Sequence, residues 1–370
     1  MAPFTPSPER RYVNASFANY DLGYPIVVTA DVAAGLGELL ERQGIPAAVV
    51  CDANRRVRAI AKTLVADRAP ILAFTLGEAR KRLETVEQVL DAMHRAGVER
   101  NSWVLGVGGG IAGDLFGFAS ATYMRGIGYA HVATSLVSMV DAAIGGKTGV
   151  NLRGGKNLAG IFRDPIAVFC DVNALRTLPA EALREGLSEV VKAAVIEGGE
   201  LFEMLEELSG DPYAAWPWGE LIAAAIKVKT AIVADDRTEA GLRETLNLGH
   251  TFAHGIERAS RYRVTHGAAV ALGLRAAGLL ALQTGRFDRA AHLRVLTLLA
   301  LFGLPLQTSL EPDSVLQAMR ADKKRRGGRL RFVLPRAIGD VEYGVECADA
   351  SVRAVLRRLR RPPESFRARR

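Results

Sequence analysis

Lysine is scarce in this chain, and that scarcity makes the few lysines informative. Of the 48 basic side chains only nine are lysines. A compact ammonium and a planar guanidinium are not interchangeable, so a chain that uses Arg for ordinary surface charge marks special positions with Lys. Codon bias with randomly placed leftovers is the alternative, and the positions decide between the two. The nine are Lys62, Lys81, Lys147, Lys156, Lys192, Lys227, Lys229, Lys323 and Lys324.

Cysteines and long apolar runs are also rare. Cys51, Cys170 and Cys347 are far apart, which excludes zinc-finger spacing and suits a reducing cytoplasm. No run of 18 apolar residues exists, and the longest uncharged candidate, 295–310, is broken by a Gly and a Pro, so we expect no membrane span. The N-terminus lacks an apolar signal core. These features predict a cytoplasmic protein.

An excess of charge of one sign is absent from most of the chain. The formal net charge is +8, but residues 353–370 hold eight Arg against one acid, Glu364, so the rest of the chain is nearly neutral. A protein that binds nucleic acid in a groove spreads basic charge over a binding face. The charge pattern excludes that class, although the tail alone could bind anions weakly.

Two sequence textures divide the chain. Short β-rich runs alternate with helical patterns in the first half, most clearly at 78–95, which predicts a parallel sheet with helices on both faces. From 180 to about 320 the pattern is helical, followed by a hairpin (329–335 with 340–345) and a last helix at 352–359. The predicted fold is an α/β Rossmann-like N-terminal domain plus an α-helical C-terminal domain. The predicted strands are 25–29, 47–52, 71–75, 102–107, 129–134 and 166–171.

A glycine-rich stretch follows the fourth predicted strand. Gly108, Gly110 and Gly113 fit the pattern G-x-G-x-x-G, which lets a phosphate approach the N–H groups at a helix N-terminus. A tight turn without a ligand is an equal alternative, because no acid lies about 20 residues further on. Asp52, at the end of an earlier strand, could hold a ribose hydroxyl instead.

The segment 141–157 is rich in glycine and poor in apolar residues. It contains Lys147 and Lys156 together with Asn151 and Asn157. Its Gly-Gly-Lys-Thr sequence is only superficially similar to a phosphate-binding P-loop, because the earlier glycine is missing. Exposed loops in this chain otherwise take Arg, so we expect an anion site here in preference to a solvated loop.

Glu189 and Lys192 lie one helical turn apart on one face. Such a pattern is most often a surface ion pair. Here the flanking residues, among them Leu187, Val190 and Val191, are mostly apolar. We therefore expect a partly buried, functional pair.

Histidine is concentrated in one region. Three of the six histidines, His250, His254 and His266, fall within 17 residues. His250 and His254 are four residues apart, so both could bind one metal ion, and a carboxylate such as Glu189 would complete a His₂Glu site with an open position. Spacing alone leaves open which histidines are the ligands.

A polar stripe leads up to these histidines. Glu239, Arg243 and Asn247 precede His250 at spacings of 4, 4 and 3, which places them on one face if the region is helical throughout. An amphipathic surface stripe is the alternative. Further along, Asp322-Lys323-Lys324 brings two of the nine lysines together, and a charged turn is an equally good explanation.

Together these stretches resemble the 3-dehydroquinate synthase family within the sugar phosphate cyclases. The resemblance keeps order and spacing from about Asp52 to Arg336. Glycerol and iron-type alcohol dehydrogenases are more remote relatives that lack the lysine-rich segment. The matching segments are GVGGGIAGDLFGFASATYMRG, TSLVSMVDAAIGGKTGVNLRGGKN, GLSEVVKAAVI, GLRETLNLGHTFAHGIE and HGAAVALGL.

The resemblance implies an NAD-binding α/β domain over 1–179, a mainly helical metal- and substrate-binding domain over 180–361, and a basic tail over 362–370. The active site would lie in the cleft between the domains. NAD is implied to lie along Asp52, Asn54, Glu78, Lys81, Gly109, Gly110, Asp114, Thr134, Ser135, Lys147, Lys156 and Thr177.

The resemblance also implies a metal and a substrate site. Zn²⁺ or Co²⁺ would be held by Glu189, His250 and His266, which leaves His254 for the substrate or a proton relay. Seven of the nine lysines, all but Lys62 and Lys227, then fall in implied site motifs. The implied substrate contacts are Arg125, Asp141, Lys147, Lys156, Asn157, Lys192, Lys229, Glu239, Arg243, Asn247, His254 and Lys323 or, in our assignment, Lys324.

The activity implied by the resemblance converts 3-deoxy-D-arabino-heptulosonate 7-phosphate to 3-dehydroquinate and phosphate, in a cytoplasmic homodimer. NAD would be reduced and reoxidised within one turnover, which makes the enzyme a carbon–oxygen lyase. Another cyclase, such as an aminodehydroquinate synthase, is the main alternative. An NAD-dependent polyol or alcohol dehydrogenase and a non-catalytic binding protein are further alternatives.

Three features depart from the family pattern. Ala268 stands where a Glu usually follows His-Gly, which removes an expected support of His266. Gly128 stands where a basic residue is common. The first 20 residues and the Arg-rich tail have no counterpart in the resemblance.

Overall fold

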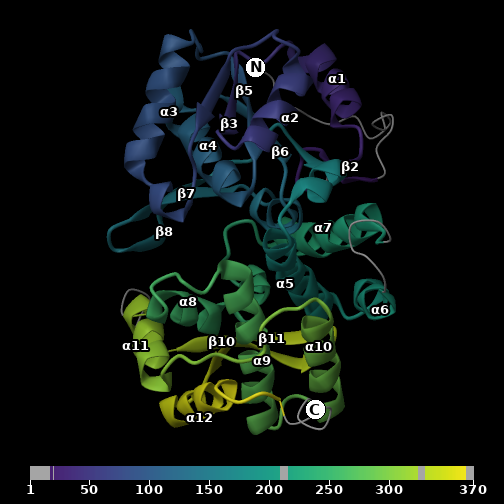
Figure 1. Cartoon of the computed structure of the whole chain (residues 1–370), viewed down its shortest axis with the longest axis vertical. Helices are drawn as coiled ribbons and strands as arrows, with labels where there is room; N and C mark the ends of the chain where they lie inside the picture. Colours follow the sequence, from purple (N-terminus) through teal and green to yellow (C-terminus); the bar gives the residue numbers. More distant parts are fainter. Residues whose placement is uncertain (1–16, 20, 209–215, 324–329, 364–370) are drawn as a thin grey trace. The chain divides into compact units, whose positions relative to one another are not determined.

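The structure is a computed structural model of the chain, and it describes residues 17–19, 21–208, 216–323 and 330–363 (Figure 1). The chain divides into two compact units. The first comprises Met1–Pro179 and Asp211–Ala234, and the second comprises Ala180–Gly210 and Asp235–Arg370. Helix α7 (Trp218–Asp235) therefore groups almost entirely with the first unit, although its sequence texture matches that of the helical half.

The first unit is built on a seven-stranded sheet with the order β1-β2-β9-β6-β5-β3-β4. All neighbouring strands are parallel except β1 and β2. The predicted α/β class is confirmed, and β1 is the strand that the sequence patterns did not reveal. The strands are β1 (Phe17–Asn19), β2 (Ile26–Thr29), β3 (Ala48–Asp52), β4 (Ile71–Phe74), β5 (Trp103–Gly108), β6 (Gly128–Ala133) and β9 (Ala167–Asp171).

Helices cover both faces of this sheet, because alternate residues of each central strand point to opposite sides. Val49 and Cys51 pack in one core with α1 (Val32–Gln43) and α2 (Arg55–Val65). Ala48 and Val50 pack in the other core with α3 (Leu83–Arg95) and α4 (Gly110–Thr122). The short helical turns of this unit are η1 (Glu78–Arg80), η2 (Tyr123–Arg125), η3 (Ser138–Ala142) and η4 (Val172–Thr177).

The lysine-rich segment, where the sequence predicts an anion site, forms a two-stranded hairpin. Strands β7 (Lys147–Leu152) and β8 (Gly155–Phe162) pair antiparallel. Gly149 pairs with Gly160, and a Cβ atom on either would lie within 2.7 Å of the opposite backbone. The glycines thus allow a close approach of two strands, and they also hide the apolar alternation by which a strand is recognised.

The second unit is helical around α9 (His266–Gln283), whose neighbours are α5, α8, α10, α12 and β10. In the part of the chain that the structure describes, α9 alone is long and apolar enough to pass the test for a membrane span, but 78% of it is buried, as in a core helix. The other elements are α5 (Ala180–Glu197), α6 (Glu200–Glu207), η5 (Leu242–Asn247), α8 (His250–Ala259), α10 (Arg289–Leu301), α11 (Pro312–Lys323), β10 (Arg331–Ala337), β11 (Asp340–Glu346) and α12 (Asp349–Leu359).

Candidate functional site

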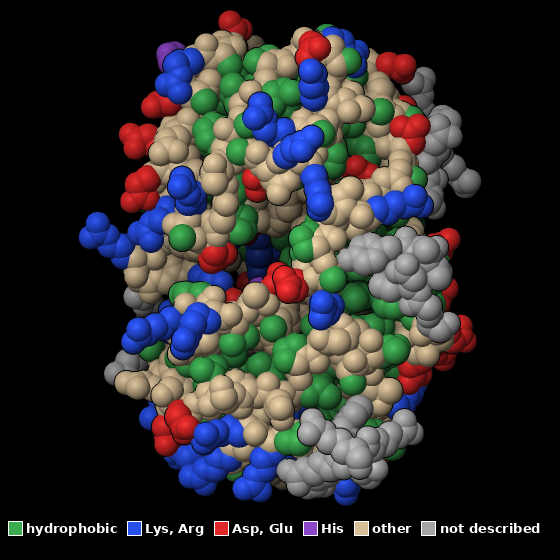
Figure 2. Space-filling model, viewed as in Figure 1, with side chains coloured by type: hydrophobic (Ala, Val, Ile, Leu, Met, Phe, Trp, Pro, Cys, Tyr) green, Lys and Arg blue, Asp and Glu red, His purple; other side chains and the backbone are tan. Residues whose placement is uncertain are grey.

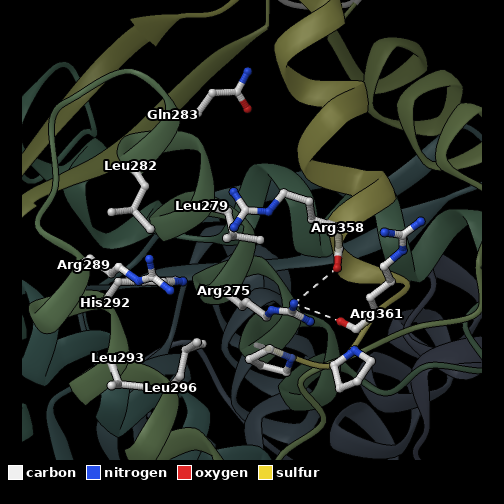
Figure 3. Close-up of a pocket in the computed structure, with 12 residues that line it drawn as sticks. Arg275, Leu279, Leu282, Gln283, Arg289, His292, Leu293, Leu296, Arg358 and Arg361 are labelled. Carbon is white, nitrogen blue, oxygen red and sulfur yellow. Dashed lines mark hydrogen bonds between the residues drawn. The ribbon is translucent and has the colours of Figure 1, made fainter. Parts of the chain in front are cut away.

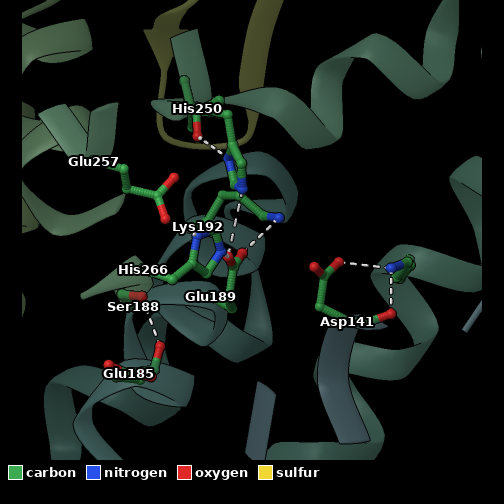
Figure 4. Close-up of polar contacts among 10 residues, drawn as sticks. Asp141, Glu185, Ser188, Glu189, Lys192, His250, Glu257 and His266 are labelled. Carbon is green, nitrogen blue, oxygen red and sulfur yellow. Dashed lines mark hydrogen bonds and ion pairs between the residues drawn. The ribbon is translucent and has the colours of Figure 1, made fainter. Parts of the chain in front are cut away.

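Three potential metal ligands of the second unit converge (Figure 4). Glu189 belongs to α5, His250 is the first residue of α8 and His266 is the first residue of α9. Their ligand atoms all lie within 4.8 Å of one another. Glu189 Oε1 is 3.1 Å from His266 Nε2 and 3.5 Å from His250 Nε2.

Each of the two histidine rings has an oxygen atom near its Nδ1, the nitrogen that does not face Glu189. His250 Nδ1 lies 3.3 Å from the carbonyl oxygen of Leu248, and His266 Nδ1 lies 3.5 Å from Glu257 Oε1. An Nδ1–H group that faces an oxygen leaves the lone pair on Nε2, and this arrangement typically supports metal-binding histidines. Both Nε2 atoms face the Glu189 carboxylate.

The donor set and its spacing fit a zinc-type ion. Two imidazole nitrogens and one carboxylate oxygen are the protein ligands of many catalytic zinc sites, which keep a fourth position open. Four ligands at about 2.0–2.1 Å in a tetrahedron lie roughly 3.4 Å apart. The separations of 3.1 and 3.5 Å from Glu189 bracket that value.

The Glu189 carboxylate is ionised although it is buried. Its side chain is 1% exposed, and Lys192 Nζ lies 2.6 Å from Oε2. Burial would raise the pKa of Glu189, but Lys192 and His250 outweigh this effect and hold the pKa well below its usual value. Burial lowers the pKa of His266, yet hydrogen bonds to Glu189 and Glu257 raise it to about 10 without a metal. Proton and metal therefore compete for His266.

His254 is not part of the group of three. It is exposed on α8, and its ring lies 5.6 Å from that of His250, nearly perpendicular to it. The continuous stripe that the spacing predicted is wrong, because Gly249 adopts φ 78° and separates η5 from α8. A side chain at Gly249 would meet the backbone N of Leu274 at 2.9 Å, so the break depends on glycine.

The polar residues before this break form a loop with its own contacts. Asn247 Nδ2 donates to Glu239 Oε1 at 2.9 Å. Arg243 is 1% exposed and donates to the carbonyl of Arg237. The Asp236 carboxylate organises the loop, since it accepts hydrogen bonds from the backbone N–H groups of Ala240, Gly241 and Arg243.

In the first unit, the glycine-rich stretch forms the expected turn. Strand β5 ends at Gly108 and α4 begins at Gly110, with Gly109 between them and no side-chain cap among the described residues. A Cβ atom on Gly108 would lie 2.5 Å from that of Ala112 and 3.8 Å from that of Asp52. Asp52 therefore lies beside a helix N-terminus that no described side chain caps, and such N-termini can bind the phosphates of a nucleotide.

Four more of the residues implied for NAD follow the carboxyl ends of the parallel strands. Thr134 and Ser135 come after β6, and the N–H of Thr134 donates to the Gly108 carbonyl at 3.0 Å. Asn54 caps α2, two residues after the end of β3. Thr177 ends η4, after β9, and its carbonyl accepts from Arg56. Ligands of open α/β sheets bind at this edge.

One network joins residues that lie far apart in the sequence. Lys81 is 4% exposed, and its Nζ contacts the Asp114 carboxylate and lies 2.6 Å from Asn157 Oδ1. Asn151 accepts a hydrogen bond from the Asn157 N–H and donates to Glu78 Oε1, each at 2.9 Å. Lys156 Nζ lies 3.3 Å from the same Glu78 oxygen. The hairpin β7–β8 is thereby fixed to η1 and α4.

A second ion pair formed by a lysine lies in the first unit. Lys229 of α7 is 2.6 Å from Asp141 Oδ1 and also contacts the Asp141 carbonyl. Lys147 is exposed at the start of β7, and Arg125 is exposed in η2 with φ 70°. Lys324 lies outside the described residues.

The structure gives Asn151, which the sequence analysis noted only as a member of the lysine-rich segment, a specific role, and it adds Glu257, which the sequence analysis did not name. Asn151 joins Asn157 to Glu78, and Glu257 contacts His266. Glu257 lies seven residues after His250, so the two share one face of α8, and that spacing is the signal that could have found it.

Comparison with known families gives a consistent match. Residues 71–185 match the profile of 3-dehydroquinate synthase N-terminal regions, and residues 186–325 match that of the C-terminal regions. The chain is 41% identical to a 3-dehydroquinate synthase from Microcystis aeruginosa over 302 residues, which is 78% of this chain and 82% of the relative.

Solved structures agree with this match. A 2-epi-5-epi-valiolone synthase from Streptomyces hygroscopicus subsp. jinggangensis, solved with NAD⁺ and Zn²⁺, superposes with a TM-score of 0.83 at 30% identity, over 91% of this chain and 96% of that one. A 2-deoxy-scyllo-inosose synthase, solved with carbaglucose-6-phosphate, NAD⁺ and Co²⁺, gives 0.80 at 25% identity, over 90% and 96%.

Proposed function

Because the chain belongs to the 3-dehydroquinate synthase family, we propose that it converts 3-deoxy-D-arabino-heptulosonate 7-phosphate into 3-dehydroquinate and phosphate. The substrate is oxidised at C5, loses phosphate, is reduced again and closes its ring by an intramolecular aldol reaction. The hydride leaves and returns within one turnover, so net redox change is zero. The enzyme is accordingly a carbon–oxygen lyase of aromatic amino acid biosynthesis.

NAD binds to the first unit in this proposal. The support is the free helix N-terminus after Gly109, with Asp52 beside it, and the strand ends that carry Thr134 and Ser135. The pyrophosphate would lie on the N–H groups of α4, and Asp52 would accept from a ribose hydroxyl. Lys81 fixes the adjoining hairpin through its hydrogen bond to Asn157 of β8.

Glu189, His250 and His266 hold Zn²⁺ or Co²⁺ in this proposal, which agrees with the ions in the two solved cyclases. An ion held by these three residues would supply Lewis-acid polarisation of a substrate hydroxyl. The carbonyl of Leu248 and the Glu257 carboxylate fix the imidazole tautomers. Lys192 balances the charge of buried Glu189 and keeps it available as an anionic ligand.

The substrate carries a carboxylate and a phosphate, and the proposed contact residues are rich in cations. Lys147, Lys156 and Lys229 belong to the first unit, and Lys192 and Arg243 belong to the second. Ammonium and guanidinium groups bind such anions through charge-assisted hydrogen bonds. The polar loop with Glu239 and Asn247, the exposed His254 and Arg125 complete the proposed set, in which Asp141 keeps Lys229 in place. Holding one flexible substrate through several steps is mainly a matter of positioning.

The convergence of Glu189, His250 and His266 carries the proposal, because no packing requirement brings two imidazoles to one buried carboxylate. The test incubates the purified protein with the heptulosonate phosphate, NAD⁺ and Zn²⁺ and measures phosphate, 3-dehydroquinate and NADH. We expect equal amounts of both products and no accumulated NADH. An aminated substrate analogue, run in parallel, identifies an aminodehydroquinate synthase, and accumulating NADH identifies a simple dehydrogenase.

The proposal extends to the oligomeric state and the cellular compartment. We propose a homodimer that acts in the cytoplasm, with residues 1–179 forming the NAD-binding domain and 180–361 the metal- and substrate-binding domain. Sedimentation velocity of the purified protein tests the dimer, and a species at the monomer mass of 39.7 kDa contradicts it.

A further inference from the structure

A cavity of about 510 Å³ lies in the second unit, between the C-terminal half of α9, the first part of α10 and the end of α12 (Figure 3). Its volume is in the range of pockets that hold small molecules, about 300–1,000 Å³. It is remote from the metal ligands. His266 opens α9, whereas Leu282 of the cavity lies sixteen residues further on, about 24 Å along a helix that rises 1.5 Å per residue.

The charged side chains in the cavity wall are all positive. Arg275, Arg289, Arg358 and Arg361 all line it, and the described lining residues include no Asp or Glu. In Figure 3 the side chains of Arg289 and Arg358 extend toward one another from α10 and α12. Figure 2 shows Lys and Arg side chains gathered at the end of the second unit that carries α12. An anion therefore meets a favourable potential here.

Arg275 is a buried cation without a carboxylate partner among the described residues. It is 3% exposed, and its guanidinium donates to three backbone carbonyls, those of Leu306, Arg358 and Arg361. Its Nε lacks a hydrogen-bond acceptor in the described part of the chain. Burial, and then the nearby Arg358, lower the pKa of Arg275 to about 10. Buried charges are usually paired, so an anion bound next to the Arg275 guanidinium would stabilise it.

His292 adds unused hydrogen-bonding capacity. It is 5% exposed, lines the cavity, and neither ring nitrogen has a hydrogen-bond partner within the described residues. Burial, with Arg275 and Arg358, lowers its pKa to about 4, so the ring is neutral and offers one donor and one acceptor. The ring fits because residue 278 is glycine, where a Cβ atom would lie 2.2 Å from Nδ1.

The rest of the wall is apolar. Leu279, Leu282, Leu293 and Leu296 contribute side chains, and Leu293 is 39% exposed. A bare inorganic ion would leave the apolar surface of these leucines exposed to water. A ligand with an apolar body would cover it and gain about 25 cal/mol for each Å² removed from water.

We propose that this cavity is a second ligand site, which binds a small organic anion consisting of an apolar body and a carboxylate or phosphate group. The anionic group lies between Arg358 and Arg289 with Arg275 beneath, and the body covers the leucines. The site is independent of the proposed catalytic function, because it shares no residue with the metal, NAD or substrate sets.

Isothermal titration calorimetry on the full chain, loaded with NAD⁺ and Zn²⁺, tests the proposal. Phenyl phosphate and phenylacetate are the probes, which separate a phosphate from a carboxylate preference. Benzyl alcohol keeps the body without the charge, and inorganic phosphate keeps the charge without the body. We expect one of the two anionic probes to bind at least about tenfold more tightly than both comparison compounds, because a charge-assisted hydrogen bond and apolar burial act together.

Variants locate the binding. Arg358→Glu reverses the charge in the wall and keeps the backbone carbonyl that Arg275 uses, so we expect at least about tenfold weaker binding. Arg357→Glu makes the same charge change on the adjacent residue, outside the lining, and should change affinity less than about twofold. Leu293→Trp fills the cavity and should abolish binding. Equal binding by inorganic phosphate that Arg358→Glu weakens as much as it weakens the probe, equal effects of the two Arg variants, or no binding by either probe overturns the proposal.

Discussion

Glu257 Oε1 lies 3.5 Å from His266 Nδ1, while Nε2 of the same ring faces Glu189 at 3.1 Å. Ala268 removes the support that the family pattern places after His-Gly, and Glu257, which is 3% exposed, is the carboxylate that supports the ring here. Its side chain comes from α8, so one helix both supplies His250 and positions His266.

Glu257→Gln tests this support. The amide keeps the size of the side chain but loses the charge that favours an N–H on Nδ1, so we expect metal affinity to fall by about 10–100-fold. Competition with a chromogenic chelator measures the affinity directly. Glu244→Gln, a change on a partly exposed carboxylate of the same unit, is the control. Equal affinities of the Glu257 variant and the parent protein contradict a role in positioning His266.

Glu189→Gln tests the proposed ligand itself. The variant removes the charged ligand and leaves Lys192, which is 4% exposed, without its 2.6 Å partner. We expect loss of bound metal and of turnover, with NAD⁺ affinity changed less than about threefold because the residues proposed to bind NAD belong to the first unit. Metal content by mass spectrometry and NAD⁺ binding by fluorescence give the two readouts. Full activity in a metal-free variant refutes the assignment.

Gly108→Ala tests the turn between β5 and α4. The added Cβ atom would lie 2.5 Å from the Cβ of Ala112, so α4 must move. We expect a loss of about 1–3 kcal/mol in the free energy of unfolding and at least about tenfold weaker NAD⁺ binding. Gly37→Ala is the matched control, because it lies inside α1 with nothing within 4 Å and should be neutral or stabilising by about 1 kcal/mol. Equal behaviour of both variants argues against a close approach at Gly108.

The stability of the protein should fall in mild acid, in part because of His131. This residue is 1% exposed between Tyr129 and Ser138, and burial lowers its pKa to about 4. The unfolded chain takes up the proton near pH 6.5, so stability is lost as the pH falls from about 6.5 toward 4, by about 2 kcal/mol at pH 5.

His131→Asn should remove that share of the pH dependence. Urea unfolding at pH 7 and pH 5, with chelator present to exclude metal effects, measures it. His94→Asn, on an exposed residue of α3, serves as the control. An unchanged difference between the two pH values in the His131 variant shows that another group is responsible.

Much of the fold could be predicted from sequence because its strands are buried on both faces. Runs such as the one at 47–52 read as continuous apolar segments, and β3 spans Ala48–Asp52. The β7–β8 hairpin could not be predicted in this way, because Gly149 and Gly160 carry no side chains to show an alternation. The stripe before His250 failed for a local reason, the positive φ of Gly249, which spacing does not register.

The candidate site, like the fold, could be predicted from the sequence only in part. Residue types and spacing indicated a metal site with Glu189 but could not choose among three histidines, since His254 is the nearer residue in sequence and His266 the one that converges. The resemblance supplied that choice. The spacing of seven places Glu257 on the face of α8 that carries His250, but its contact with His266 joins α8 to α9 and is seen only in the folded chain.

In the proposed reaction NAD is reduced and reoxidised while phosphate leaves. The most direct measurement follows phosphate, 3-dehydroquinate and absorbance at the NADH band together, in the purified protein with the heptulosonate phosphate, NAD⁺ and Zn²⁺. We expect equal amounts of phosphate and 3-dehydroquinate over many turnovers with no net NADH. Steady accumulation of NADH, or no release of phosphate from the metal-loaded protein, contradicts it.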